Sequence, residues 1–221
     1  MNKTISALAI ALAALLPFCG CAKNDTSNPK TGEPAMNNIG KALVVYFSAT
    51  GTTKGVAQRL AGAIGADIFE IVPAQPYTDA DLNWHNKQSR SSVEMADRKS
   101  RPAIANAAPD LADYKTVFVG FPIWWYREPS IIDTFVETNA ESLAGKTIVP
   151  FATSGGSGMG DSTANLQALA PKAKVTPGRR LGASVDDGTL KVWAADIAKA
   201  SNKEKASHVQ THEANQAAAS R

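Results

Sequence analysis

The central part of this sequence contains no cysteine and almost no histidine. Only 2 of the 221 residues are cysteine, and both, Cys19 and Cys21, lie near the N-terminus. Of the 3 histidines, His208 and His212 lie in a polar C-terminal stretch and His85 stands alone. These absences exclude a disulfide framework, a thiol nucleophile and a thiolate metal site from the central part. The sequence predicts no metal site.

A strong charge imbalance is also missing. The formal net charge is +3, but lysine and arginine nearly balance aspartate and glutamate between Lys41 and Ala200. A basic surface for a phosphate backbone is therefore not indicated, and we expect no nucleic-acid partner. A strongly acidic docking face is not indicated either.

The N-terminus has an apolar stretch that is too short to span a bilayer as a helix. Lys3 precedes this stretch, Ile5 to Leu16, which is typical of a signal peptide. The sequence Phe18-Cys19-Gly20-Cys21 follows and resembles a bacterial lipoprotein processing site. We expect Cys21 to be lipidated, because the bulky Phe18 directly before Cys19 disfavours cleavage there. The protein would then be exported and anchored to the membrane surface on the periplasmic side. The alternative is an ordinary cleaved signal and a soluble periplasmic or secreted protein.

Composition divides the chain into four segments. The stretch after the signal is rich in Asn, Lys, Thr, Pro and Gly, which is typical of a flexible tether. The predicted segments are a signal peptide with a lipoprotein-type cleavage site over 1–21, a tether over 22–40, a folded domain over 41–200, and a polar tail over 201–221 that is disordered or loosely helical.

Strand-like and helix-like stretches alternate in the folded domain. Several of the strands are nearly continuous apolar runs, as in parallel strands covered by helices on both faces. The alternation predicts an α/β fold with a doubly wound parallel sheet, whose ligands bind at the carboxyl ends of the strands. The predicted strands are Ala42–Phe47, Asp67–Val72, Thr116–Phe121, Thr147–Ala152 and a short one near Arg179–Ala183; the predicted helices are Thr53–Ile64, one within Asp79–Lys99, Ser130–Glu137, Ser162–Ala170 and Thr189–Ala200.

The first strand leads into a loop of hydroxyl groups that suits a phosphate. The loop Ser48-Ala49-Thr50-Gly51-Thr52-Thr53 precedes a helix, where free backbone N–H groups and the positive end of the helix dipole meet. It lacks the lysine of a Walker A motif and the three glycines of a dinucleotide fingerprint. Amides and hydroxyls alone suit one terminal phosphate better than a Mg-bound triphosphate. The alternative is a capped helix without a ligand.

Two more loops follow apolar strands. The segment Pro122-Ile123-Trp124-Trp125-Tyr126 carries three consecutive aromatic side chains, so at least one must be exposed or cover a ligand. The glycine-rich segment Thr153-Ser154-Gly155-Gly156-Ser157-Gly158 allows close approach to the backbone and offers N–H groups to a polar ring edge. The alternatives are a packing cluster or a protein-contact patch for the aromatics and a flexible linker for the glycines. Together the three loops describe a phosphorylated planar ligand, and FMN fits this description.

The same stretches resemble the flavodoxin-like superfamily, and specifically its FMN-binding oxidoreductase branch. The resemblance runs from about Lys41 to Ala200 and includes Pro76-Tyr77-Thr78-Asp79-Ala80-Asp81-Leu82 and Ser100-Arg101-Pro102. It implies a five-stranded sheet in the order 2-1-3-4-5 and noncovalently bound FMN. A departure follows Trp125, where relatives often have a small residue and this chain has Tyr126-Arg127-Glu128-Pro129.

The resemblance also implies roles for residues of all three loops. No side chain is assigned as catalytic, because hydride transfer to the flavin needs no acid or base. The implied cofactor-binding residues are Ser48, Ala49, Thr50, Gly51, Thr52 and Thr53 at the phosphate, Pro122, Ile123, Trp124, Trp125 and Tyr126 at the ring, and Thr153, Ser154, Gly155, Gly156, Ser157 and Gly158 at its other edge.

We expect an FMN-dependent oxidoreductase that passes electrons, with NAD(P)H as the donor, to a small acceptor such as a quinone. The first alternative is a flavodoxin-type electron-transfer protein that docks to a redox protein, which the near-neutral domain disfavours. The second is a tethered FMN-binding module without turnover. The insertion Asp79–Arg101 either shapes a substrate or nicotinamide site or is a solvated helix. The sequence does not decide between a monomer and a homodimer.

Overall fold

The computed structural model describes residues 39–219 of the chain. The expected signal peptide, Cys21 and nearly all of the tether lie outside the described residues. Strands and helices alternate along the described part, as predicted. They are β1 (Ala42–Tyr46), α1 (Thr52–Ile64), β2 (Asp67–Glu70), α2 (Arg90–Ala96), β3 (Thr116–Pro122), α3 (Ser130–Thr138), β4 (Thr147–Thr153), α4 (Ser162–Leu169), β5 (Lys174–Val175), β6 (Arg179–Arg180) and α5 (Asp187–Ala219).

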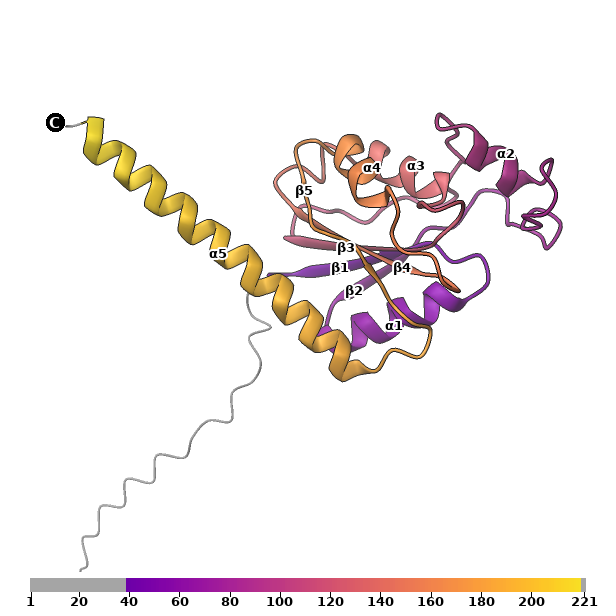
Figure 1. Ribbon diagram of the computed structural model, residues 1–221, viewed down its shortest axis with the longest axis horizontal. Helices are drawn as coiled ribbons and strands as arrows, with labels where there is room; N and C mark the ends of the chain where they lie inside the picture. Colours follow the sequence, from indigo (N-terminus) through magenta and orange to yellow (C-terminus); the bar gives the residue numbers. More distant parts are fainter. Residues whose placement is uncertain (1–38, 220–221) are drawn as a thin grey trace, which may run out of the picture. The chain divides into compact units, whose positions relative to one another are not determined.

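A parallel sheet in the order β2-β1-β3-β4-β5 forms the centre of the fold (Figure 1). β5 pairs with the start of β4 and β6 with its end, so the two short strands share the fifth position. The predicted flavodoxin-like sheet is therefore confirmed, with its last strand divided in two. β5 was not predicted, because a strand of two residues leaves no pattern of alternating or continuous apolar side chains.

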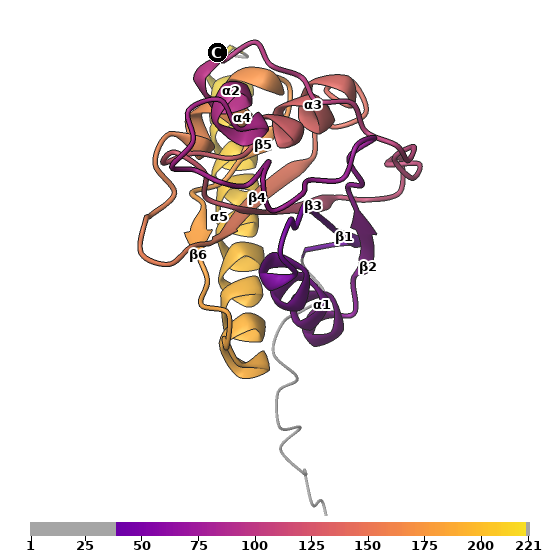
Figure 2. The same ribbon diagram turned by 90° about the vertical axis from the view of Figure 1, so that its right-hand side faces the viewer.

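Helices cover both faces of the sheet. Leu43 and Val45 of β1 belong to a buried cluster that includes residues of α3 and α4. Val44 and Tyr46 point to the opposite face, into a cluster with residues of α1 and α5. This alternation follows from the strand period of two residues. Figures 1 and 2 show the same layers, with α1 and α5 on one side of the sheet and α3 and α4 on the other.

The C-terminal helix is longer than predicted. α5 continues past Ala200 and ends at Ala219, through the segment that was predicted to be disordered or loosely helical. Alanine, lysine, glutamate and glutamine are frequent in this segment, and their high helix propensity accounts for the continuation.

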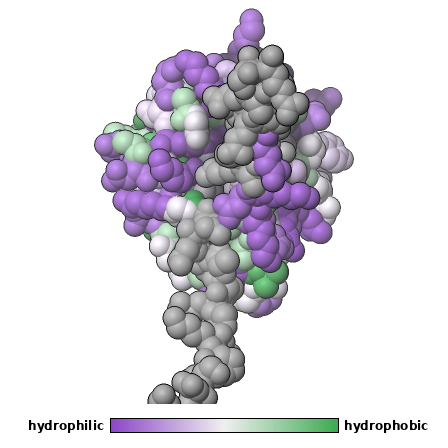
Figure 3. All heavy atoms as spheres, turned by 90° about the vertical axis from the view of Figure 1, so that its left-hand side faces the viewer, coloured by the Kyte–Doolittle hydropathy of each residue, from purple (hydrophilic) through white to green (hydrophobic). Residues whose placement is uncertain are grey.

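The described residues do not include a membrane-spanning helix. No helix within residues 39–219 is both long enough and apolar enough to cross a bilayer. On the face drawn in Figure 3, the described residues are mainly hydrophilic, with apolar side chains scattered among them.

Candidate functional site

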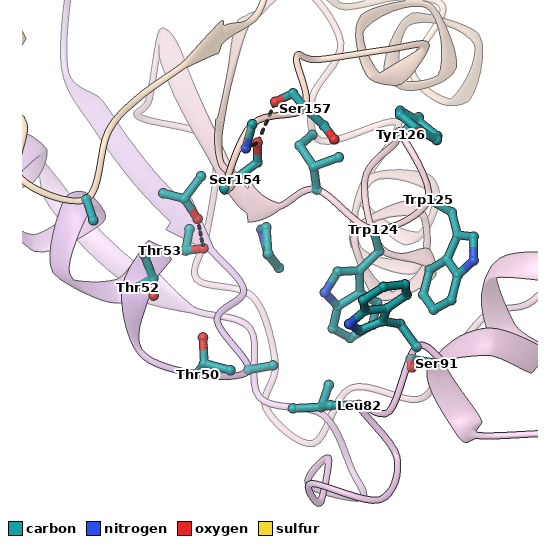
Figure 4. A pocket seen from close by; sticks show the side chains of 18 residues that line it. Thr50, Thr52, Thr53, Leu82, Ser91, Trp124, Trp125, Tyr126, Ser154 and Ser157 are labelled. Atoms are coloured by element: carbon teal, nitrogen blue, oxygen red, sulfur yellow. Dashed lines mark hydrogen bonds between the residues drawn. The ribbon is translucent and has the colours of Figure 1, made fainter. Parts of the chain in front are cut away.

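The loops after β1, β3 and β4 meet at the carboxyl edge of the sheet and enclose a cavity of about 1000 Å³. This edge is where open α/β sheets bind their ligands. Every residue predicted in the three loops lines the cavity, except Ser48, Gly51 and Gly158. Figure 4 shows the threonines of the first loop on one side of the cavity and Trp124 and Trp125 on the other.

The loop after β1 has the geometry of an anion site. The backbone N–H of Gly51 donates to Ser48 Oγ at 3.1 Å, and Gly51 adopts a left-handed φ of 88°. α1 begins at the next residue, so the amides of its first turn have no intrahelical acceptor. The amides and the helix dipole thus favour a negative group beside Thr50 and Thr52, whose side chains line the cavity. Ser48 and Gly51 shape this loop rather than line the cavity.

Lys54 directly follows this loop in the sequence, and its side chain forms an ion pair with Glu70. Lys54 Nζ lies 2.8 Å from Glu70 Oε2, and Glu70 also accepts a hydrogen bond from the Tyr46 hydroxyl at 2.8 Å. Burial and the Glu70 carboxylate raise the pKa of Tyr46. Charge compensation of a bound phosphate would therefore come from amides and hydroxyls, as the sequence predicts.

Thr53 connects the first loop to the glycine-rich loop. Its hydroxyl lies 2.8 Å from the Thr153 hydroxyl, and both side chains are buried (Figure 4). Ser154 Oγ accepts from the Gly156 N–H at 3.2 Å and donates to the Ser157 carbonyl, which curls the loop around the cavity. A Cβ at Gly155 or Gly156 would meet nothing within 4 Å. The backbone here is therefore open to a ligand.

The loop after β3 contains a strained turn. The N–H of Trp124 donates to the Arg127 carbonyl at 2.9 Å, and the N–H of Arg127 donates back to the Trp124 carbonyl at 3.0 Å. Trp125 and Tyr126, the central residues, have φ values of 44° and 63°. Glycine or asparagine normally fills such positions, and a bulky residue there costs about 1–3 kcal/mol. Such strain is typical of ligand sites.

The three aromatic residues of this loop have different environments. Trp124 packs edge-on against Phe47 and Tyr77, with ring centroids 5.7 and 5.3 Å away. Trp125 and Tyr126 are 43% and 76% exposed and line the cavity. The packing-cluster alternative therefore describes one side of Trp124, while the strained turn presents the other two rings to a ligand or to solvent.

A buried ionic cluster holds the strained turn. Arg127 Nη1 lies 3.0 Å from Asp133 Oδ2 and 3.4 Å from Glu128 Oε1, and its Nη2 donates to Ser130 Oγ at 3.2 Å. The Glu128 N–H donates to Ser162 Oγ at 2.9 Å, which ties the turn to α4. All three charged residues are buried. In the sequence Tyr126-Arg127-Glu128-Pro129, Tyr126 therefore lines the cavity, while Arg127 and Glu128 are buried and support the turn from inside the protein.

Asp133 is the titratable group that this cluster perturbs most. Burial, with the neighbouring Glu128 carboxylate, raises the pKa of Asp133 to about 7, and Arg127 opposes this shift. Asp133 Oδ1 and Glu128 Oε2 are buried without a hydrogen-bond partner among the described residues. Burial beside a second carboxylate thus favours the protonated form of Asp133.

Four residues that line the cavity were not predicted. Leu82, Trp84 and Ser91 come from the Asp79–Arg101 insertion, and Ala183 follows β6. The insertion was predicted to be either part of a site or a solvated helix, and the structure places three of its residues at the cavity. A tryptophan within an otherwise polar stretch was the signal that could have identified Trp84.

Histidine, cysteine, aspartate and glutamate are absent from the described residues that line the cavity. Among residues 39–219, no three histidine, cysteine, aspartate or glutamate side chains lie close enough to hold an ion. Hydroxyls and amides at one end and flat indoles at the other are the donors and surfaces available. They suit a phosphate joined to a planar ring.

The doubly wound sheet and its hydroxyl-rich first loop define the flavodoxin-like class. Residues 41–197 match the family model described as Flavodoxin. This match covers most of the chain, so the protein belongs to the flavodoxin family. No curated protein matches the chain significantly.

Solved structures agree with this assignment. A candidate flavoprotein from Bacteroides eggerthii is 51% identical, with a TM-score of 0.68 over 72% of this chain and 98% of that chain. A second, from Bacteroides uniformis, is 49% identical, with a TM-score of 0.64 over 70% of this chain and 97% of that chain. A Lactobacillus acidophilus flavoprotein in complex with FMN is 21% identical, with a TM-score of 0.57 over 70% and 99%, and shows the same fold.

Proposed function

We propose that this protein binds FMN in the cavity and passes electrons from NAD(P)H to a small acceptor. One observation carries the proposal: the free N-terminus of α1 and the indoles of the β3 loop face the same cavity of about 1000 Å³ (Figure 4). A site for a phosphate and a surface for a planar ring are thereby joined. Ligand sites of this kind commonly have volumes of about 300–1,000 Å³.

The residues present fit FMN. Thr50, Thr52 and the amides of the first turn of α1 would hold the phosphate. Trp124, fixed by Phe47 and Tyr77, would form a wall beside the ring, and the open backbone at Gly155 and Gly156 would face its polar edge. When bound, FMN supplies reversible one- or two-electron chemistry. These residues would hold and orient the ring, and Trp124 would keep water from the part of the ring beside it.

The charge distribution favours an enzyme over an electron carrier. Electrostatic steering of a carrier onto its partner needs a strong field of one sign. Here positive and negative side chains nearly balance between Lys41 and Ala200. A small acceptor that diffuses into the cavity needs no such field.

Anaerobic mixing with NADPH or NADH tests the enzymatic part of the proposal. FMN-loaded protein should lose its visible flavin absorbance within seconds, and an added small acceptor should restore it. An unchanged spectrum with both nucleotides, in protein that binds FMN, would leave the carrier or the non-redox module as the function.

The location of the protein is a separate proposal. We propose that Cys21 carries a lipid that anchors the chain on the periplasmic side of a bacterial membrane. Cys21→Ser should move the protein from the membrane fraction to the soluble fraction, while Cys19→Ser should not. Equal membrane association of both variants and the wild type would contradict lipidation at Cys21.

A further inference from the structure

The Asp79–Arg101 insertion presents one aromatic side chain to the cavity. Trp84 lines the cavity and is nevertheless 67% exposed. Its ring lies against the ring of His85, with the centroids 3.5 Å apart and the two planes tilted by 32°. Other large aromatic side chains that line the cavity are Trp124, Trp125 and Tyr126 of the β3 loop. Aromatic rings therefore face the cavity from two segments that are far apart in the sequence.

The loop that carries Trp84 is held in place by hydrogen bonds. The N–H of Leu82 donates to the Thr78 carbonyl at 3.1 Å, and the Ser91 hydroxyl donates to the Asp81 carbonyl at 2.6 Å. α2 is itself attached to α3, because Ser130 Oγ donates to the Glu94 carbonyl at 3.1 Å. Trp84 is thus presented by a fixed loop.

Although its ring contacts His85, Trp84 remains 67% exposed. A tryptophan buries about 150–250 Å² when it packs, and each Å² of apolar surface removed from water contributes about 25 cal/mol. Because Trp84 is mostly exposed, it gains little of this free energy of burial, although hydrogen bonds hold the loop that carries it. A flat ligand that covers the indole would recover it.

The lack of charged side chains around the cavity limits the kind of ligand that would bind beside Trp84. Among the described residues that line the cavity, none is lysine, arginine, histidine, aspartate or glutamate. The amides at the α1 end are assigned to the phosphate of the cofactor. A charged group on an acceptor inside the cavity would therefore find no side-chain counter-ion among these lining residues.

We propose that Trp84 determines acceptor specificity by stacking on an uncharged, planar aromatic acceptor of the quinone class and holding it against the bound flavin. This inference rests on the proposed function and assigns a role to the insertion within it. The cavity lies at the upper end of the size range for small-ligand sites, which leaves room for a second ring. The quinone takes up two electrons and two protons and becomes a hydroquinone, while the reduced flavin returns to its oxidised form. One proton comes with the electrons from the flavin, and the other comes from water.

Trp84→Ala and Trp84→Phe test the proposal, with Val93→Ala as the matched control. Val93 is exposed on α2 of the same insertion and does not line the cavity. The probes are 1,4-naphthoquinone, its sulfonate, which carries a negative charge, and ferricyanide, which does not stack. Binding of naphthoquinone to oxidised holoprotein is followed by the change in flavin absorbance. Reoxidation is followed by stopped flow after reduction with dithionite, so the result does not depend on NAD(P)H.

Trp84→Ala should weaken naphthoquinone binding and raise its half-saturation concentration by about tenfold, the effect of one lost aromatic stack. FMN affinity and the rate with ferricyanide should not change, Trp84→Phe should restore most of the binding, and Val93→Ala should match the wild type. The sulfonate should bind at least tenfold more weakly than the neutral quinone. Equal naphthoquinone binding by wild type and Trp84→Ala, or equal binding of the two quinones, would overturn the inference while FMN binding stands. Protein that binds no FMN would instead overturn the proposed function.

Discussion

At the scale of the residue, the central feature is that polar and aromatic side chains lie on opposite sides of one cavity. Thr50 and Thr52 place hydroxyls where the amides of α1 are free, and Trp124 and Trp125 place flat rings on the opposite side (Figure 4). Neither set alone indicates a ligand, because threonines cap helices and tryptophans pack in cores. Their meeting in one cavity is what distinguishes a site from ordinary structure.

The double substitution Thr50→Val and Thr52→Val tests the phosphate end. Loss of two hydroxyl donors to a charged phosphate should weaken FMN binding by about 2–4 kcal/mol, since such hydrogen bonds contribute about 1.5–3 kcal/mol each and are not fully additive. Fluorescence titration of the apoprotein with FMN measures the change, and riboflavin, which lacks the phosphate, serves as the control ligand. If riboflavin and FMN lost affinity equally, the loop would not be the phosphate site.

Asp133 gives a prediction about pH. Burial raises its pKa to about 7 in the folded protein, compared with 3.8 for a free side chain. Between these values the folded state holds a proton that the unfolded state has released, so the free energy of unfolding should fall as pH rises through this window. Below the window the stabilisation is fully present, and above about pH 7 this contribution no longer changes.

Asp133→Asn should remove that decline, because an amide does not titrate. Urea unfolding at pH 5 and pH 8 compares the two proteins. The wild type should lose more stability than the variant between these values, and Ser162→Ala, which removes an uncharged partner of the same cluster, should keep the wild-type slope. Parallel pH profiles of wild type and Asp133→Asn would show that Asp133 is ionised throughout.

At the scale of the element, the β4–α4 loop and the β3 turn depend on one another. Gly160 has a φ of 50°, and a Cβ there would lie 1.7 Å from the Tyr126 carbonyl oxygen. A side chain at this position would have to displace the strained turn. The glycine-rich loop was predicted to approach a ligand, and at Gly160 it approaches the backbone of the protein's own turn.

Gly160→Ala should therefore disturb the site indirectly, because Gly160 does not line the cavity but lies against the turn that does. We expect a loss of stability of about 1–3 kcal/mol from strain and the displaced turn, together with FMN binding at least tenfold weaker. Gly62→Ala is the matched control, since its Cβ would meet nothing within 4 Å and α1 should gain stability from alanine. Thermal unfolding and FMN titration on both variants separate the effects. Unchanged FMN affinity in Gly160→Ala would mean that the turn does not shape the site.

Sequence reasoning predicted long apolar strands best. β1, β3 and β4 are buried on both faces, and such strands leave nearly continuous apolar runs. β5 was missed, because a strand of two residues has no period. The three site loops were identified because each follows a recognisable strand.

The parts of the site that were missed depend on tertiary structure. Trp84 lies in an insertion without a strong periodic pattern, and tertiary contacts such as the hydrogen bond from Ser130 to the Glu94 carbonyl hold this insertion beside the cavity. The buried cluster of Arg127, Glu128 and Asp133 was also not foreseen, because charged residues in a loop are usually solvated. Long-range contacts of this kind leave no local pattern in the sequence.

At the scale of the whole molecule, the chain is a flavodoxin-family domain whose described part extends from residue 39 to residue 219. The sheet brings three loops to one edge, and the Asp79–Arg101 insertion is the fourth segment that lines the cavity there. The near balance of charges sets this domain apart from a carrier that relies on a strong field to find a protein partner. The cavity and the charge balance are the basis on which we propose a small acceptor.

The most direct test of the account is equilibrium titration of the purified apoprotein with FMN, followed by quenching of flavin fluorescence. We predict one FMN per chain with a micromolar or lower dissociation constant, quenched emission because the ring lies against indoles, and much weaker binding of riboflavin. Emission that stays at the level of free FMN up to hundreds of micromolar protein would contradict the central claim that this cavity holds the flavin.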